Sequence, residues 1–249
     1  MTSTRLNKFI AHSAGLSRRE ADEAIAAGRV HVNNALALLG TQVKPTDVVV
    51  LDGTKITAQR QYTYLLLNKP VGYVCSRRAQ GDAPTIYSLL PDQYHALKTV
   101  GRLDRDSSGL IILTDDGDFA HRMTHPRFAK TKVYRVELDH ALEPLHQQMI
   151  SDFGVTLDDG ISRFSVMKLD DGQWTVDNRK SQNNTATIPN AQRPTSNVYC
   201  VTMSEGRNRQ IRRTFAALGY TVTHLHRTTF GPYRLTNEKP GEFHLVASI

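Results

Sequence analysis

The sequence has few cysteines and no long apolar segment, and each shortage excludes a class of protein. Its 249 residues include two cysteines, Cys75 and Cys200, too few for a disulfide framework or a four-thiolate zinc site. No apolar run approaches the ~20 residues that a membrane-spanning helix requires, and the polar segment from Met1 to Phe9 lacks the apolar stretch of a signal peptide. We therefore expect a soluble, cytoplasmic protein that has no membrane partner.

Acidic residues are outnumbered, and the excess of basic residues is unevenly distributed. The 31 Lys and Arg residues against 24 Asp and Glu residues give a formal charge of +7. Residues 1–60 hold 8 basic and 5 acidic side chains (+3), residues 61–177 hold 13 and 16 (−3), and residues 178–249 hold 10 and 3 (+7). This distribution indicates two basic surfaces around a less basic body, which suits a nucleic-acid partner.

Two helices are predicted at the start of the chain. The first runs through Leu6 and Ile10, which have helical spacing, and ends at Gly15. The segment from Ser17 to Glu20 has the pattern of a capping box, in which the serine hydroxyl and the glutamate carboxylate satisfy free amides at the helix start. A second helix therefore follows, and it ends before Gly28, where a left-handed residue is expected.

Short strands are predicted after the helices. Val30 and Val32 alternate with polar residues, and Asn33-Asn34 supplies a turn. The residues from Val48 to Leu51 form a further candidate strand, which Asp52-Gly53 closes. Residues 54–63 are polar and lack periodicity, so we expect a linker there.

Four stretches of this front segment occur in the order RLNKFI (5–10), SRREA (17–21), IAAGRVHVN (25–33) and VKPTDVV (43–49). They resemble the S4 RNA-binding domain, and the resemblance implies RNA docking by four basic residues: Arg5, Lys8, Arg18 and Arg19. Arg18 and Arg19 follow a helix N-cap, where free amides and the helix dipole already favour phosphate. A solvated basic helix face is the alternative for these side chains.

The segment from Gly101 to Leu110, GRLDRDSSGL, precedes an apolar strand that extends to Leu113. Its glycine and small hydroxyl residues permit close approach of another backbone. Arg102 and Arg105 flank Asp104 and are expected to keep its carboxylate ionised. An ionised carboxylate can act as a nucleophile or a base. An acidic turn with local ion pairs is the alternative.

Five stretches follow one another as LLLNKPVGYVCS (65–76), GRLDRDSSGL (101–110), LTDDGDFAHR (113–122), KTKVYRV (130–136) and SEGRNRQIRR (204–213). They resemble the motifs of pseudouridine synthases. With the S4-like front segment, nearly all of residues 4–249 are similar to the bacterial ribosomal-RNA pseudouridine synthases. The resemblance implies an isomerase that converts uridine in ribosomal RNA to pseudouridine without a cofactor or a metal.

Residue by residue, the resemblance implies five roles. Asp104 is the catalytic aspartate, Tyr134 stacks on the target base, and Arg212 pairs with the catalytic carboxylate. Arg102 occupies the space that the flipped nucleotide leaves, and Ile211 forms an apolar wall of the pocket. Extruding a uridine costs a few kcal/mol, and stacking on an aromatic face recovers ~1–3 kcal/mol per base. For Tyr134, packing within a sheet is the alternative.

A helix is predicted from Arg207 to Leu218, with Gly219 as its stop. The side that carries Ile211 is apolar and faces a core. The opposite side presents three arginines: Arg209, Arg212 and Arg213. A basic face near the positive end of a helix suits both a carboxylate and RNA phosphates, and a solvated face is the alternative.

We assign no functional site to two polar segments of the sequence. Carboxylates at Asp115, Asp116 and Asp118 could attract a hard cation, but we expect Asp118 to cap a helix that begins at Phe119, with Asp116-Gly117 as a turn. Residues 178–197 are polar and contain few hydrophobic residues, which predicts a loop between two strands.

We therefore predict an α+β protein with two domains. Residues 1–58 form a small S4-like RNA-binding domain, and residues 59–249 form the catalytic domain. The catalytic domain is expected to contain a mixed, largely antiparallel sheet with flanking helices and a central cleft. We expect a monomer whose partner is ribosomal RNA or a ribosome-assembly intermediate.

Three alternatives to a small-subunit (16S) RNA modifier stay open at this point. The first is a synthase of the same family that acts on the large-subunit (23S) RNA. The second is a non-catalytic S4-type factor that binds ribosomes or assists their assembly. The third is a metal-dependent nuclease that uses Asp104, Asp106 and the carboxylates of residues 115–118.

Overall fold

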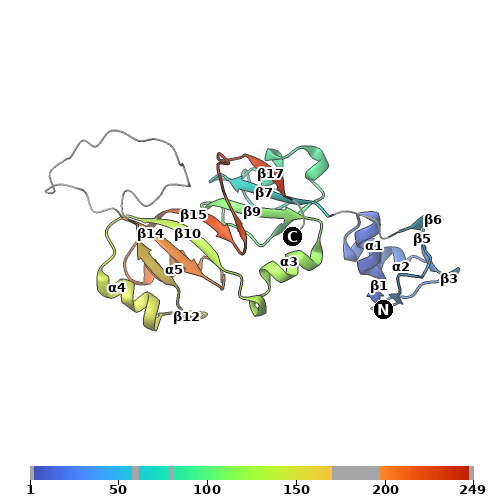
Figure 1. The fold of residues 1–249 in the computed structure, drawn as a ribbon, viewed down its shortest axis with the longest axis horizontal. Helices are drawn as coiled ribbons and strands as arrows, with labels where there is room; N and C mark the ends of the chain where they lie inside the picture. The colour runs from blue at the N-terminus through green and yellow to red at the C-terminus, as the bar shows by residue number, and fades with distance from the viewer. Residues whose placement is uncertain (1–2, 58–61, 79–80, 170–196, 247–249) are drawn as a thin grey trace. The chain divides into compact units, whose positions relative to one another are not determined.

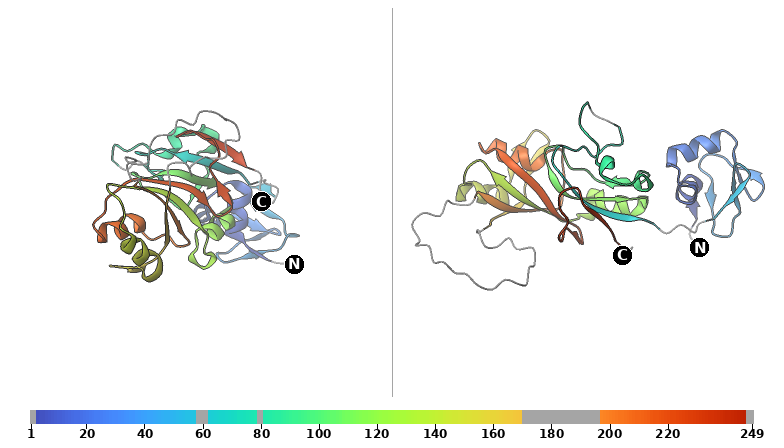
Figure 2. Two further views of the ribbon diagram at one scale, coloured as in Figure 1. Left: turned by 60° about the vertical axis from the view of Figure 1, so that its left-hand side comes forward. Right: turned by 90° about the horizontal axis from the view of Figure 1, so that it is seen from above.

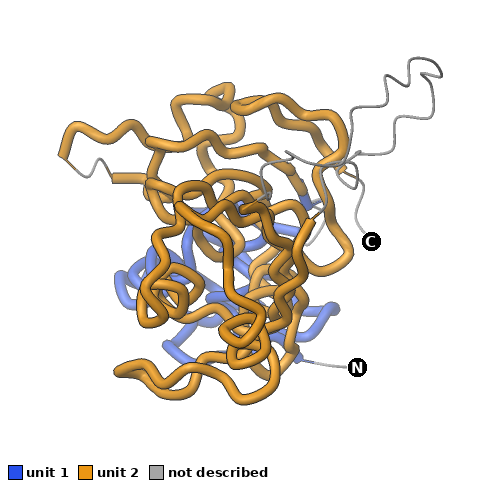
Figure 3. Tube along the Cα trace, turned by 90° about the vertical axis from the view of Figure 1, so that its left-hand side faces the viewer, with its two compact units in different colours: residues 1–63, 248–249 blue, residues 64–247 orange. Residues whose placement is uncertain are grey.

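The computed structural model describes residues 3–57, 62–78, 81–169 and 197–246. The chain divides into two compact units, unit 1 with residues 1–63 and 248–249 and unit 2 with residues 64–247 (Figures 1 and 3). The predicted domain boundary at residue 58 and the predicted loop at 178–197, apart from Asn197, lie outside the described residues. Within the described part, no helix combines the length and the apolar character needed to cross a membrane.

The two predicted helices of unit 1 are confirmed. Helix α1 (Leu6–Ala14) ends at Gly15, which has a φ of 74°. Helix α2 (Arg18–Ala26) begins with the predicted capping box. The Ser17 hydroxyl accepts from the Glu20 amide at 3.1 Å, and the Ser17 amide donates to the Glu20 carboxylate at 2.5 Å.

The strands of unit 1 form a four-stranded sheet in the order β3-β2-β5-β6 and a separate pair, β1 with β4. Their bounds are β1 (Thr4–Arg5), β2 (Val30–Val32), β3 (Ala35–Leu36), β4 (Gln42–Val43), β5 (Val49–Leu51) and β6 (Thr54–Ile56). The predicted linker is wrong for residues 54–56, because these residues pair with β5. Asp52 and Gly53 both have positive φ, 50° and 76°, and such a two-residue turn continues directly into a hairpin strand.

Unit 2 is built on a nine-stranded sheet in the order β13-β14-β10-β15-β9-β7-β17, with β16 beside β15 and β8 beside β9 (Figures 1 and 2). The bounds are β7 (Tyr64–Lys69), β8 (Lys98–Val100), β9 (Ser108–Thr114), β10 (Lys132–Leu138), β13 (Ser165–Lys168), β14 (Val198–Met203), β15 (Val222–Phe230), β16 (Tyr233–Arg234) and β17 (Phe243–Val246). A separate hairpin pairs β11 (Val155–Leu157) with β12 (Gly160–Ser162). Only β9 and β15 pair in parallel within this described sheet, so the predicted mixed, largely antiparallel sheet is confirmed.

Helices flank this sheet, as predicted. They are α3 (Gly117–Thr124), α4 (Pro144–Gln148) and α5 (Gln210–Ala217), with 3-10 turns at Ile86–Leu89, Asp92–Tyr94 and Pro126–Phe128 and a π-helical turn at Met149–Phe153. Helix α3 packs beside β8, and α5 packs beside β11 and β15. One continuous core joins the sheet to α5 and to the turns at Ile86–Leu89 and Met149–Phe153, and it includes Leu67, Ile111, Val136, Val201 and Phe215.

Helix α3 begins earlier than predicted, and the predicted cap is wrong. Asp116 caps the helix, because its Oδ1 accepts from the amides of Asp118 and Phe119 at 3.0 and 2.9 Å. The other carboxylate oxygen of Asp116 accepts from the Tyr64 hydroxyl at 2.8 Å. Because this buried contact fixes Asp116, Gly117 becomes the first helical residue and Asp118 lies in the first turn.

Gly109 marks the junction between the two antiparallel parts of the sheet. It has a φ of 105°, and a Cβ atom at this position would lie 2.2 Å from the carbonyl oxygen of Arg227. Gly109 pairs with Arg227 where β9 and β15 run in parallel. The predicted close approach of another backbone is thus confirmed, and it brings the loop before β9 beside β15.

Candidate active site

A buried lysine at the end of β7 holds the loop that carries Asp104. Lys69, at the end of β7, is 0% exposed, and its Nζ donates to the carbonyl oxygens of Pro70, Asp104 and Ser107 at 3.0, 3.0 and 2.6 Å. Burial lowers the pKa of Lys69, and the charges of Cys75, Asp104 and Asp106 act in the opposite direction. Two of the ammonium's three hydrogen bonds therefore fix the backbone of the loop, at Asp104 and Ser107, and the third goes to Pro70 directly after β7.

We did not predict a role for Lys69. The available signal was a lysine at the end of the otherwise apolar YLLLN run. A charged residue is rarely buried without fixed partners, but a lysine at a strand end is usually exposed, and the sequence does not show which carbonyl oxygens surround it.

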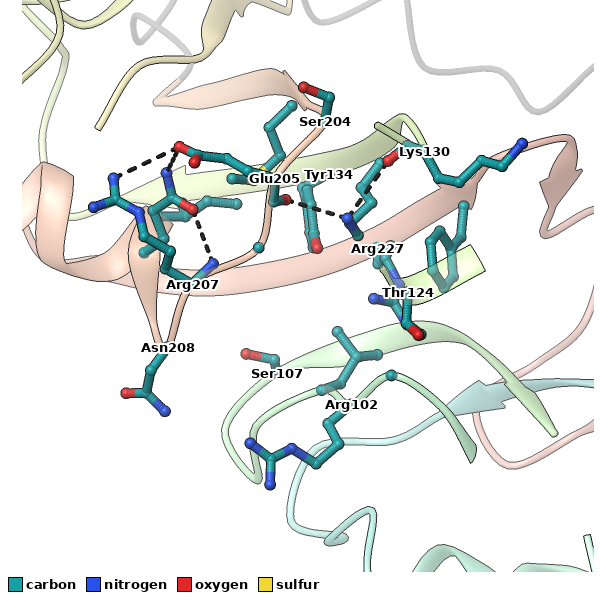
Figure 4. A pocket seen from close by; sticks show the side chains of 18 of the residues that line it. Arg102, Ser107, Thr124, Lys130, Tyr134, Ser204, Glu205, Arg207, Asn208 and Arg227 are labelled. Atoms are coloured by element: carbon teal, nitrogen blue, oxygen red, sulfur yellow. Dashed lines mark hydrogen bonds and ion pairs between the residues drawn. The ribbon is translucent and has the colours of Figure 1, made fainter. Parts of the chain in front are cut away.

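A cavity of about 440 Å³ lies against this loop (Figure 4). Five of the predicted site residues line it: Arg102, Asp104, Tyr134, Arg209 and Ile211. They come from the loop before β9, from β10 and from the start of α5, so the fold gathers segments that are far apart in the chain. Because the cavity lies between these segments, the predicted central cleft of the catalytic domain is confirmed.

Among the described residues, Arg209 is the ion-pair partner of Asp104. The charges of Arg212 and Lys69 also act on this carboxylate. The side chain of Asp104 is 36% exposed, and its Oδ2 lies 3.7 Å from Nη1 of Arg209. We predicted that Arg102 and Arg105 would supply the positive charge beside Asp104, but both are exposed. Arg209 has a left-handed φ of 46° and immediately precedes α5. This backbone conformation turns its side chain toward the loop.

Arg212 contacts Asp106 within ion-pair distance, and its charge also acts on Asp104, so the predicted pairing of Arg212 with Asp104 stays a prediction. Its Nη2 donates to the backbone carbonyl of Asp106 at 2.8 Å, and its Nη1 donates to the carbonyl of Val222 at 2.7 Å. Its Nε lies 3.3 Å from the Asp106 carboxylate. Two backbone carbonyls therefore occupy the guanidinium fork that we expected to face Asp104.

Asp106 joins the two arginines. Arg209 donates to both of its carboxylate oxygens, at 3.1 and 2.8 Å. Burial alone would raise the pKa of Asp106, but the hydrogen bonds from Arg209 and the charges of Arg212 and Arg209 outweigh burial and lower the pKa. Asp106 is thus an ionised anchor for both guanidiniums, a role that the sequence did not reveal because we considered it only as a metal ligand.

The remaining predicted RNA-binding residues lie elsewhere. Arg213 contacts Asp158 and, at 2.6 Å, Asp159 on the β11–β12 hairpin. Arg209 and Arg212 thus share Asp106 as a partner, whereas Arg213 is turned to the hairpin, so the three arginines do not form one common basic face. In unit 1, the side chains of Arg5, Arg18 and Arg19 are exposed and Lys8 is half-buried.

Tyr134 and Ile211 form apolar parts of the cavity wall. Tyr134 is 8% exposed and Ile211 is 4% exposed. Tyr134 lies on β10 between Val201 of β14 and Arg227 of β15, and its phenol ring faces the cavity (Figure 4). A flat aromatic group at the wall of a cavity offers a surface on which a planar base can stack.

Among the acidic residues after β9, Asp116 serves the fold. The two carboxylate oxygens of Asp116 bind the Tyr64 hydroxyl and the start of α3. Across the described ranges, no group of three or more His, Cys, Asp or Glu side chains is arranged to hold a metal ion.

Comparisons with known proteins follow the division into two units. The RNA pseudouridylate synthase family matches residues 63–217, and the S4 domain matches residues 4–49. The chain is 34% identical over 247 residues to the ribosomal small subunit pseudouridine synthase A of Pasteurella multocida, covering 98% of this chain and 96% of that protein. A crystal structure of a pseudouridylate synthase shares a TM-score of 0.63 and 30% identity, over 98% of this chain and 96% of that chain.

A large-subunit enzyme is equally similar in sequence. The chain is 34% identical over 244 residues to the ribosomal large subunit pseudouridine synthase B of Pseudomonas aeruginosa. That match covers 94% of this chain, and the chain spans 57% of the length of that relative. Equal identity to the two relatives does not separate the two subunits as targets.

Proposed function

Because the chain belongs to the RNA pseudouridylate synthase family, we propose that it isomerises uridine to pseudouridine in ribosomal RNA, with Asp104 as its catalytic carboxylate. The observation that carries this assignment is the shared cavity, in which Asp104 faces the same space as Tyr134 and Ile211. The three residues come from three of the matched motifs, and the cavity supplies a carboxylate, a stacking surface and an apolar wall together.

The chemistry follows from these groups. A uridine within structured RNA is shielded by its neighbours, so it must be extruded before a protein group can reach it. Tyr134 then receives the base, and Asp104 acts at the sugar or the base while the N1–C1′ bond breaks. The base rotates, C5 bonds to C1′, C5 gives up its proton, and N1 takes one up. The product is an isomer of the substrate, so the net reaction consumes no oxidant or reductant.

We assign Arg209, Asp106 and Arg212 to positioning. Arg209 is held by two hydrogen bonds to Asp106, so its contact with Asp104 at 3.7 Å has a defined geometry. The longer contact leaves the Asp104 carboxylate less constrained than the Asp106 carboxylate. A loosely paired carboxylate suits a group that must attack carbon or take a proton. Arg102 is exposed at the mouth of the cavity, and we assign it to the space that the extruded nucleotide leaves.

The finer assignments concern the target and its binding. We favour the small-subunit 16S RNA as the substrate, with the large-subunit 23S RNA as the alternative. Unit 1 docks the RNA through exposed or half-buried cations: Arg5, Lys8, Arg18 and Arg19. The working form is a monomer that acts on free ribosomal RNA or an assembly intermediate in the cytoplasm. Mapping pseudouridine by chemical adduct formation and reverse transcription, in a strain that lacks the protein, identifies the target.

One assay tests the activity and the role of Asp104 together. Ribosomal RNA labelled with 5-tritiated uridine releases tritium when C5 bonds to C1′ and loses its proton. We expect release by the wild type in EDTA and a loss of ~10⁴-fold or more for Asp104→Asn. Asp92→Asn is the matched control, because that carboxylate is fully exposed and lies outside the cavity.

The alternatives predict other results in the same assay. Activity that survives Asp104→Asn contradicts the proposed role of this residue. Cleavage of RNA that requires a divalent cation identifies a nuclease. Binding without tritium release from any ribosomal RNA or assembly intermediate identifies a non-catalytic factor.

A further inference from the structure

Two cationic side chains lie on the inner wall of the cavity, and the roles assigned so far do not use them. Arg227 of β15 is 2% exposed, its Nε donates to the carbonyl of Leu110 at 2.8 Å, and its Cζ lies 4.8 Å from the ring centre of Phe230. Lys132 of β10 lies 5.4 Å from the same ring centre, and its Nζ donates to the carbonyls of Lys130 and Glu205 at 3.4 and 3.2 Å. Both line the cavity.

Neither cation has an ion-pair partner among the described side chains, and the charge of Glu205 acts on Lys132 from beyond ion-pair distance. In the same described part of the chain, Nη2 of Arg227 is buried without a hydrogen-bond partner. The nearby Glu205 directs its carboxylate to Gln210 and Arg207. A buried charged donor without a partner is costly, and a ligand that accepts a hydrogen bond from it removes this cost.

The strand register places the pair beside the stacking surface. Tyr134 is the Cα partner of Arg227 across β10 and β15. Lys132 precedes Tyr134 by two residues on β10, and alternate residues of a strand share a face. Figure 4 shows Tyr134 and Arg227 on the wall of one cavity. A base that stacks on Tyr134 would therefore present an edge to the wall that both cations line.

A uracil base carries acceptors at that edge. Its two carbonyl oxygens accept hydrogen bonds, whereas a guanidinium and an ammonium offer donors only. When the N1–C1′ bond breaks, its electron pair stays with the base and the negative charge spreads over N1 and the carbonyl oxygens. If Asp104 attacks the base, an electron pair likewise moves onto a carbonyl oxygen.

We propose that Arg227, with Lys132 beside it, donates to a carbonyl oxygen of the stacked uracil and stabilises the negative charge that this base carries after N1–C1′ cleavage. This inference rests on the proposed function. In the reaction, the electron pair passes from the N1–C1′ bond to the base and then forms the C5–C1′ bond. Arg227 keeps its protons throughout. Fixed donors aimed at a developing charge are an effective form of electrostatic catalysis.

The test compares uracil with 5-fluorouracil as the base that departs from C1′. Single-turnover rates are measured on ribosomal RNA that contains uridine and on RNA that contains 5-fluorouridine, by following the target nucleoside in digests. Arg227→Gln is expected to lower the rate with uridine by about 100-fold, as for the loss of one donor to a developing oxyanion, with little change in RNA Kd. Because fluorine itself stabilises the departing base anion, the loss with 5-fluorouridine should be several-fold smaller.

Further variants keep the test decisive. Arg227→Lys retains the charge and should recover part of the rate. Arg135→Gln is the matched control, because it removes an arginine from the same strand pair outside the cavity. Thermal unfolding shows whether each variant folds, and Lys132→Gln takes the place of Arg227→Gln if the latter does not.

Three outcomes are informative. An equal loss on both substrates overturns the inference and indicates a structural role. A weaker RNA Kd with an unchanged saturated rate overturns it in favour of a phosphate contact. A wild-type protein that is inactive on both RNAs contradicts the proposed function itself, and so separates that failure from a failure of the inference.

Discussion

In unit 1 the side chains of Arg5, Arg18 and Arg19 lie exposed beside a small core, whereas in unit 2 Lys69 and Arg227 are 0% and 2% exposed. The exposed arginines can meet phosphate groups at many positions along an RNA. The buried cations have fixed contacts with backbone carbonyls, three for Lys69 and one for Arg227. Burial therefore distinguishes the exposed cations, which we expect to attract RNA, from Lys69, which fixes backbone, and from Arg227, which we propose contacts the reacting nucleotide.

This difference has a consequence that can be measured. Phosphate contacts on a surface displace counterions, so their contribution to affinity falls as salt rises. Buried groups are screened much less by salt. We expect substitutions in unit 1 to change the salt dependence of RNA binding, and substitutions of the buried residues in unit 2 to change the rate or the folding free energy at any salt concentration.

The largest expected effect is that of Lys69→Met. The substitution leaves the carbonyls of Pro70, Asp104 and Ser107 without their buried donor. Each unsatisfied group costs about 1–3 kcal/mol, so the free energy of unfolding should fall by about 3 kcal/mol or more. Denaturant titration measures this. Lys98→Met, an exposed lysine on β8, is the control, and equal stability of the two variants would show that the loop is held by other contacts.

An intermediate effect is expected for Asp106→Asn. The variant weakens the two hydrogen bonds that fix Arg209, and the turnover rate should fall about tenfold, comparable to one charge-assisted hydrogen bond. Asp158→Asn is the control, because Asp158 is largely exposed and pairs with Arg213 outside the cavity. A wild-type rate for Asp106→Asn would remove Asp106 from the positioning network.

The same variant tests the pH dependence of stability. The folded protein lowers the pKa of Asp106, so this contribution to stability is complete above the unfolded pKa of about 3.9 and is lost as pH falls through the lower folded value. Wild-type stability should therefore decline more steeply below pH ~4 than the stability of Asp106→Asn. Parallel curves in acid would mean that the ion pairs of Asp106 do not stabilise the fold.

The smallest effect is expected in unit 1. The double variant Arg18→Gln with Arg19→Gln should weaken RNA binding modestly and reduce the slope of log Kd against log salt by about 1 to 2, while the saturated rate stays unchanged. Arg29→Gln is the control, because Arg29 already donates to Asp52 at 2.7 Å. A slope that stays at the wild-type value would exclude these two arginines from docking.

Local signals in the sequence predicted local structure well. The capping box at Ser17–Glu20 and the Asn33-Asn34 turn depend on residues within a few positions of one another, so their energetics can be judged from neighbours alone. The error at Asp116 and Asp118 arose because local signals alone do not distinguish these two residues. Either aspartate can cap a helix locally, and the distant Tyr64 hydroxyl selects Asp116.

The site was predictable in its members but not in its contacts. Motif resemblance located Asp104, Tyr134 and Ile211, which do line one cavity. It did not show that Arg209 has a left-handed backbone, which brings that side chain to Asp104 while Arg212 binds Asp106. The burial of Lys69 and Arg227 depends on strands far apart in the sequence, and so their partners appear only in the folded chain.

The contact at Gly109 sets a fixed span within the catalytic unit. Gly109 follows Asp104 by five residues, and its backbone lies against the backbone of Arg227. The separation between Asp104 and Arg227 is thus determined by the backbone on both sides. We therefore expect substitutions on the outer surface of unit 2 to leave the spacing between Asp104 and Arg227 unchanged.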